Sequence, residues 1–92
     1  MLFIVNDEEN FLIFEEFSKK VEGCRVVYTN ERFPEGERKV YINVKPDNEE
    51  DICFIDTWGM TDEIPQAHIV SKSDKEKKVM QVCGFLNIKH LI

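Results

Sequence analysis

The sequence lacks most of the short motifs through which small domains bind nucleotides or metal ions. Its four glycines stand apart from one another, so no glycine-rich loop is present to cradle a phosphate group. It has no C-x-x-C and no H-x-x-x-H pair, and these are common spacings of zinc ligands. We therefore predict no cofactor and no metal ion.

Long apolar runs are also missing. The N-terminal run 1–5 is followed at once by polar and acidic residues, so we predict that it is not a signal peptide. No run approaches the roughly 18 residues of a membrane span. The three cysteines form an odd set, whereas a small secreted domain usually carries an even disulfide set. We predict free thiols, a reducing cytoplasmic setting and no membrane association.

The charge of the chain is unevenly spread. The net charge is −6. The length of 92 residues predicts a single domain spanning residues 1–92. Between Pro46 and Ser71 there are seven acids and no Lys or Arg, whereas residues 72–92 hold five bases and two acids. Direct binding of nucleic acid is disfavoured, because it depends on Lys and Arg at the phosphates. A protein partner with a basic surface suits this layout.

Apolar periodicity predicts strands and two helices. One helix begins at Asn6 or Asp7 and presents a stripe of Phe11, Phe14 and Phe17. The other begins at Ser73 in a capping box with Glu76. Gly84 either weakens that helix or ends it. Strands are predicted at residues 2–5, 24–29, 40–44, 52–55 and 88–92, with a further short strand at 68–70. The lysines of the second helix, Lys75, Lys77 and Lys78, are expected mostly off its apolar face, as solvated charge.

The segment 39–58 is interpreted as two strands joined by an acidic turn at Pro46–Asn48. The predicted order is β-α-β-β-β-α-β. Two helices would pack on one face of a mostly antiparallel sheet of four to five strands, giving an α+β two-layer sandwich that is a variant of the split β-α-β arrangement. Such a fold hosts many unrelated functions and indicates none by itself.

A catalytic site is conceivable with Cys53 as thiolate, His68 as base and Asp56 as the residue that orients the base. No local motif supports it, and burial in an apolar strand would leave the Cys53 thiol inert. The acids in the predicted loops are interpreted as solvated, since general acid catalysis needs a desolvated carboxyl. We therefore predict a protein that is not an enzyme, with a small enzyme as an alternative.

The stretch from Asp56 to Glu63 holds the only tryptophan, beside a methionine and between acids. Trp58 either plugs one end of the core or anchors an interface, because Trp and Met are enriched at interface centres. The candidate partner-binding residues share this acidic region: Asp47, Glu49, Glu50, Asp51, Asp56, Trp58, Met60, Asp62 and Glu63.

These residues lead to a functional hypothesis. The chain is predicted to be a small acidic module that regulates or inhibits a protein partner by imitating a phosphate track on its basic, nucleic-acid-binding surface. The alternative is a structural or assembly subunit that self-associates through an edge strand, such as the predicted strand 88–92. Either a monomer or a homodimer fits the sequence.

Overall fold

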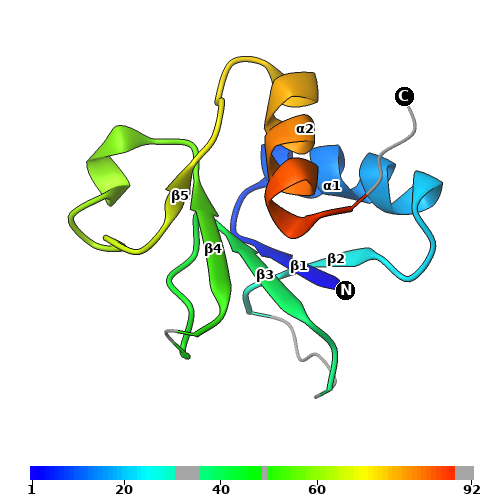
Figure 1. Cartoon of the computed structure of the whole chain (residues 1–92), viewed down its shortest axis with the longest axis horizontal. Helices are drawn as coiled ribbons and strands as arrows, with labels where there is room; N and C mark the ends of the chain where they lie inside the picture. The colour runs from blue at the N-terminus through cyan, green and yellow to red at the C-terminus, as the bar shows by residue number, and fades with distance from the viewer. Residues whose placement is uncertain (31–35, 49, 89–92) are drawn as a thin grey trace.

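A computed structural model describes residues 1–30, 36–48 and 50–88 of the chain (Figure 1). It contains a five-stranded sheet, two α-helices and one short 3-10 helix. The elements are, in chain order, β1 (Leu2–Val5), α1 (Glu8–Lys20), β2 (Arg25–Tyr28), β3 (Lys39–Ile42), β4 (Ile52–Ile55), η1 (Trp58–Met60), β5 (His68–Ile69) and α2 (Lys75–Leu86).

Every neighbouring pair of strands in the sheet is parallel. The strand order is β2-β1-β3-β4-β5, with β1 between β2 and β3. β4 pairs with β3 and β5, again in parallel. The predicted mostly antiparallel sheet is therefore wrong, although two helices and a five-stranded sheet are present.

The connection between β3 and β4 is what makes these two strands parallel. Turn chemistry is present where it was predicted, because Asn48 accepts a hydrogen bond from the Glu50 N–H at 3.0 Å and its carbonyl accepts one from the Asp51 N–H. This turn lies within a crossover, however, and not within a hairpin. Nine residues separate Ile42 from Ile52 and return the chain to the opposite end of the sheet, and those that the structure describes form no helix. A helical crossover of about a dozen residues is usual between parallel strands.

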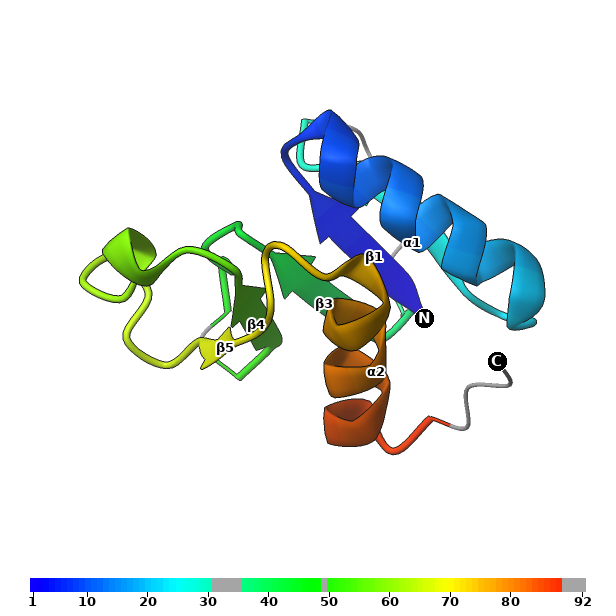
Figure 2. The same cartoon turned by 90° about the horizontal axis from the view of Figure 1, so that it is seen from above.

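Both helices lie on one face of the sheet, here called the helix face, as predicted (Figure 2). Phe3 of β1 stacks on Phe14 of α1 with ring centroids 4.8 Å apart, and Phe17 meets Phe3 edge-on at 5.6 Å. On α2, Val82 and Leu86 are buried against the same core. Each of these large side chains stabilises the fold by roughly 1.5–3 kcal/mol on burial.

The opposite face of the sheet, here called the loop face, is packed against irregular chain. Its buried side chains include Ile4, Tyr41 and Cys53. Ile64, in the connection from β4 to β5, is 1% exposed and packs into this layer, and Val44 of the preceding crossover packs against it. The inner strands are thus buried on both faces, as parallel strands usually are.

The helix termini follow ordinary capping rules. Asp7 caps α1, accepting a hydrogen bond from the Asn10 N–H at 3.0 Å, which confirms one of the two predicted caps. The predicted capping box at Ser73 is wrong, because Asp74 caps α2 by accepting from the Lys77 N–H. α2 continues through Gly84 to Leu86.

The chain leaves α2 through Asn87, whose φ of 58° lies in the left-handed region that asparagine tolerates. Ile88 follows outside any strand and packs against the core of the helix face. The remainder of the predicted strand 88–92, residues 89–92, lies outside the described residues.

Candidate functional site

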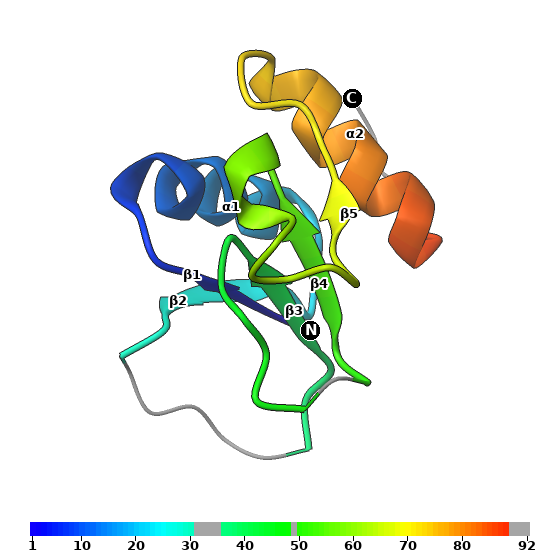
Figure 3. The ribbon, with the colours of Figure 1, turned by 90° about the vertical axis from the view of Figure 1, so that its left-hand side faces the viewer.

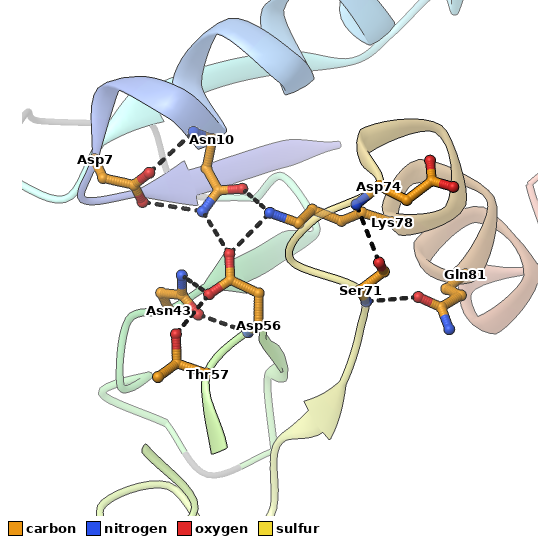
Figure 4. A network of polar contacts seen from close by, with 9 residues as sticks. All are labelled: Asp7, Asn10, Asn43, Asp56, Thr57, Ser71, Asp74, Lys78 and Gln81. Atoms are coloured by element: carbon orange, nitrogen blue, oxygen red, sulfur yellow. Dashed lines mark hydrogen bonds and ion pairs between the residues drawn. The ribbon is translucent and has the colours of Figure 1, made fainter. Parts of the chain in front are cut away.

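The carboxyl ends of β1, β3 and β4 meet at one edge of the sheet, because these strands are parallel. Asp7, Asn43 and Asp56 follow the three strands at this edge. Figure 4 shows Asn43 turned toward Asp56, and Asp7 turned toward Asn10, which also contacts Asp56. The strand order is that of flavodoxin-like open sheets, in which ligands bind at this edge, next to the point between β1 and β3 where the order reverses. A ligand-binding site in a sheet of this strand order is therefore expected at this edge.

Lys78 reaches this edge from α2. Its ammonium nitrogen lies 2.8 Å from Asp56 Oδ2 and donates to Asn10 Oδ1 at 2.7 Å (Figure 4). Asn10, in the first turn of α1, donates in turn to Asp7 Oδ1 at 3.0 Å. The network thus joins both helices to the end of β4.

Asn43 holds the other side of Asp56. The Asn43 amide donates to Asp56 Oδ1 at 2.8 Å, and its own Oδ1 accepts from the Asp56 N–H at 3.0 Å. Asn43 adopts a φ of 57°, a left-handed conformation that asparagine reaches more easily than most residues. Asn6 donates to the Asn43 carbonyl at 3.1 Å, which ties this turn to the end of β1.

The carboxylate of Asp56 is saturated with donors. Lys78 and Asn10 donate to Oδ2, the latter at 3.4 Å, while Asn43 and Thr57 donate to Oδ1. Burial raises the pKa of Asp56, but the hydrogen bonds from Lys78, Asn43 and Thr57 and the Lys78 charge outweigh burial. The pKa of Asp56 is lowered from 3.8 to about 2.

This closed network of side chains, here called the clamp, is not an open reaction site. Its members are Asp7, Asn10, Asn43, Asp56, Thr57 and Lys78. Lys78 is 0% exposed, Asn10 is 1% exposed and the Asp56 side chain is 6% exposed. A carboxylate with about four lone-pair positions, all occupied, has none left for a substrate proton. The place where a ligand binds in flavodoxin-like sheets is therefore filled by the chain's own side chains.

The turn after the clamp presents Trp58 to solvent. η1 begins directly after Thr57 and forms the light-green turn beside β4 in Figure 3. Trp58 is 74% exposed. The Thr61 hydroxyl donates to the Trp58 carbonyl at 2.8 Å, and Ile64 anchors the end of the turn in the core. Trp58 does not plug the core, so the first of the two interpretations of this residue is wrong.

The acids predicted to bind a partner fall into two groups at opposite ends of β4. Asp47 and Glu50 are exposed and Asp51 is half-buried in the crossover before the strand, whereas Asp62 and Glu63 are exposed after η1. Met60 is half-buried and packs against the loop-face core. Asp56 is buried in the clamp, and Glu49 lies outside the described residues.

The first acidic group lies close to the loop face. Burial raises the pKa of Tyr41, and the charges of Asp51 and Asp47 raise it further. Tyr41 is 6% exposed and belongs to the loop-face core. Because Met60 and Val44 pack on the same core, both acidic groups border this face.

The structure does not bring Cys53 and His68 together. Cys53 lies in the loop-face core and donates to the Val44 carbonyl at 3.2 Å. His68 pairs in register with Phe54, on the helix face, and its ring centroid lies 3.8 Å from that of Phe85. Burial raises the pKa of Cys53 to about 11, although the Val44 hydrogen bond lowers it slightly. A thiol in this state is a poor nucleophile.

Four residues of the clamp were missed from the sequence, namely Asn10, Asn43, Thr57 and Lys78. Lys78 was grouped with the solvated lysines of α2, and Asn10 was not singled out. The helical spacing carries a signal for Lys78, since it directly precedes Val79 and lies four residues before Val82, on the border of the buried stripe. Asn10 follows its cap Asp7 by three residues, a spacing that suits a capping contact.

Comparisons with known proteins give no relative: no family model, no curated protein and no solved structure matches the chain. Neither described helix has the length and apolar character needed to cross a membrane. Within the same residues, no group of three or more His, Cys, Asp or Glu side chains is arranged to hold a metal ion.

Proposed function

We propose that the chain is a non-catalytic module that binds a protein partner through the surface around Trp58 and the acids bordering the loop face. The single observation that carries this proposal is the 74% exposure of the only tryptophan, on a turn braced from both sides. A large aromatic side chain held in solvent costs free energy unless a partner covers it, and tryptophan is enriched among binding hot spots.

The charge around Trp58 favours a basic partner. Asp47, Glu50, Asp62 and Glu63 are exposed, and the stretch that holds them contains no Lys or Arg. Acids of one sign steer a basic surface toward the tryptophan and raise the association rate. A protein surface that normally binds nucleic acid is the partner we propose, with the module as its regulator or inhibitor.

The setting we propose is cytoplasmic. All three cysteines are free thiols, and two of them, Cys53 and Cys83, are buried. Thiols persist in this state in reducing compartments, where disulfides are rare.

Affinity capture from the native host tests this proposal. The wild type is compared with Trp58→Ala and with a loop variant in which Asp47, Glu50, Asp62 and Glu63 become Asn or Gln. The matched control neutralises four exposed acids of the N-terminal region, Glu8, Glu9, Glu16 and Glu22. We expect a captured protein that both surface variants lose and the control retains, and that duplex DNA or RNA displaces.

Each variant is first checked by circular dichroism so that loss of folding is not mistaken for loss of binding. Equal capture by the loop variant and the wild type at low salt would remove the electrostatic part of the proposal. Equal capture by Trp58→Ala would remove the tryptophan as anchor.

A further inference from the structure

The outer edge of β5 is open within the described part of the chain. β5 is last in the strand order and, among the described strands, pairs only with β4. The Val70 N–H donates to the Ile55 carbonyl at 2.9 Å, so the N–H of Ile69, one residue earlier in the extended chain, points away from β4. Such an edge offers backbone groups to another strand.

Exposed apolar side chains flank this edge on both faces of the sheet. Ile69, in register with Ile55 on the loop face, is 39% exposed. On the helix face, Met80 and Phe85 of α2 are 54% and 50% exposed, and Phe85 packs against the His68 ring. We call His68, Ile69, Met80 and Phe85 the β5-edge surface. A strand added to this edge could pack against apolar side chains on both faces of the sheet, as the inner strands do.

The β5-edge surface borders a hollow lined by no acidic residue, lysine or arginine. None of the residues lining this hollow, which lies between β5 and α2, is Asp, Glu, Lys or Arg, although 33% of the chain is charged. The hollow between α1 and α2 differs, because Glu16, Lys20, Lys75 and Glu76 line it. Interface centres are depleted of charge and enriched in Met and aromatic residues, so the β5-edge surface has the composition of one.

We propose that two copies of the chain associate through the β5-edge surface, with the two β5 edges pairing antiparallel across a two-fold axis. A two-fold interface brings a surface against itself, so it requires a surface that does not repel its own copy. The β5-edge surface, which holds no Asp, Glu, Lys or Arg, meets this condition, whereas the acidic surface around Trp58 would face like charges. This inference is independent of the proposed partner, because it uses a different surface.

Analytical ultracentrifugation of the purified chain over a wide concentration range tests the association. We expect a reversible dimer whose dissociation constant hardly changes with salt, because the contact is uncharged. Met80→Lys and Phe85→Lys should each raise the dissociation constant by roughly a hundredfold, since an unpaired charge would be buried at the interface. Leu12→Lys is the matched control: Leu12 is 55% exposed on α1, and its replacement should leave the dimer intact.

Hydrogen exchange of the unaltered chain tests the strand pairing without a substitution. We expect the Ile69 amide to exchange slowly at high concentration and rapidly after dilution below the dissociation constant. A chain that is monomeric at every concentration, or a dimer that Leu12→Lys weakens as much as Phe85→Lys, would overturn the proposal. A dimer in which the Ile69 amide exchanges as fast as in the monomer would overturn the edge pairing.

Discussion

The ammonium nitrogen of Lys78 lies 2.8 Å from Oδ2 of Asp56, and both side chains are buried. This contact joins α2 to the residue that follows β4, two positions before Trp58. A buried ion pair is costly to desolvate, and it remains favourable only while each charge keeps its partner. The pair therefore behaves as a unit, and the first predictions concern what happens when one member is removed.

Replacing Lys78 by methionine should lower the free energy of unfolding by about 3–5 kcal/mol, because the Asp56 carboxylate would stay buried without its cation. Urea unfolding followed by circular dichroism measures the loss. The control is Lys77→Met, one residue earlier on the exposed side of α2, which should change stability by less than about 0.5 kcal/mol. Similar losses in the two variants would contradict the buried pair.

The double variant Lys78→Met with Asp56→Asn should be more stable than the sum of the two single changes predicts. Once the lysine is absent, neutralising the aspartate removes a buried charge that has lost its partner. Unfolding free energies of the wild type, both single variants and the double variant give the coupling energy. Additive losses would show that the two charges do not depend on each other.

Acid should destabilise the chain through Asp56. Since the pKa of Asp56 is lowered from 3.8 to about 2, the folded state binds fewer protons than the unfolded state between these values, and stability rises with pH. The contribution, about 2 kcal/mol, is complete above roughly pH 5 and is lost as pH falls through about 2. Urea unfolding between pH 2 and pH 5 should give a flatter profile for Asp56→Asn. Asp62→Asn, at an exposed position, should keep the wild-type slope.

The thiols should differ in reactivity in the folded chain. Burial raises the pKa of both Cys53 and Cys83 to about 11, and the charge of Cys24 adds to the effect at Cys83. Cys24 is only partly buried, so we expect iodoacetamide to modify it first at pH 8. Peptide mass spectrometry identifies the modified residue. Modification of Cys53 as fast as that of Cys24 would revive the alternative of a reactive thiol.

The cap of α2 can be tested by two neighbouring substitutions. Asp74→Ala should cost about 0.5–2 kcal/mol, because the N–H of Lys77 loses its acceptor. Ser73→Ala, at the position the sequence favours as the cap, should cost much less. Thermal unfolding of the two variants decides between the two positions, and the reverse order of losses would restore the capping box.

Much of the secondary structure could be predicted because local sequence determines it. The apolar runs of β1 and β4 predicted these strands, and the spacing of Phe14 and Phe17 predicted the buried face of α1. Strand direction was predicted wrongly because a short turn sequence around Asn48 fits a hairpin and a crossover equally well. The continuous apolar runs of β1 and β4 are typical of parallel strands. The turn sequence nevertheless favoured a hairpin, and so antiparallel strands.

The clamp could not be predicted without the strand directions. Asp7, Asn43 and Asp56 each follow a strand, but they meet only if the three strands point the same way. The exposure of Trp58 likewise depends on where the chain turns after β4, which composition does not determine. The acidic stretch could be recognised from composition, while the division of its acids into two groups required the position of β4 between Asp51 and Asp56.

The contact between Lys78 and Asn10 spans 68 positions of the chain, and this length has a consequence for folding. During synthesis from the N-terminus, β1 and α1 leave the ribosome long before α2. Asp56 and Asn10 therefore have no contact with Lys78 until α2 has been synthesised. Parallel sheets also form slowly, because their paired strands are far apart in the sequence. A chain stalled before Lys78 would therefore keep the Asp56 carboxylate without its cation at the carboxyl end of β4.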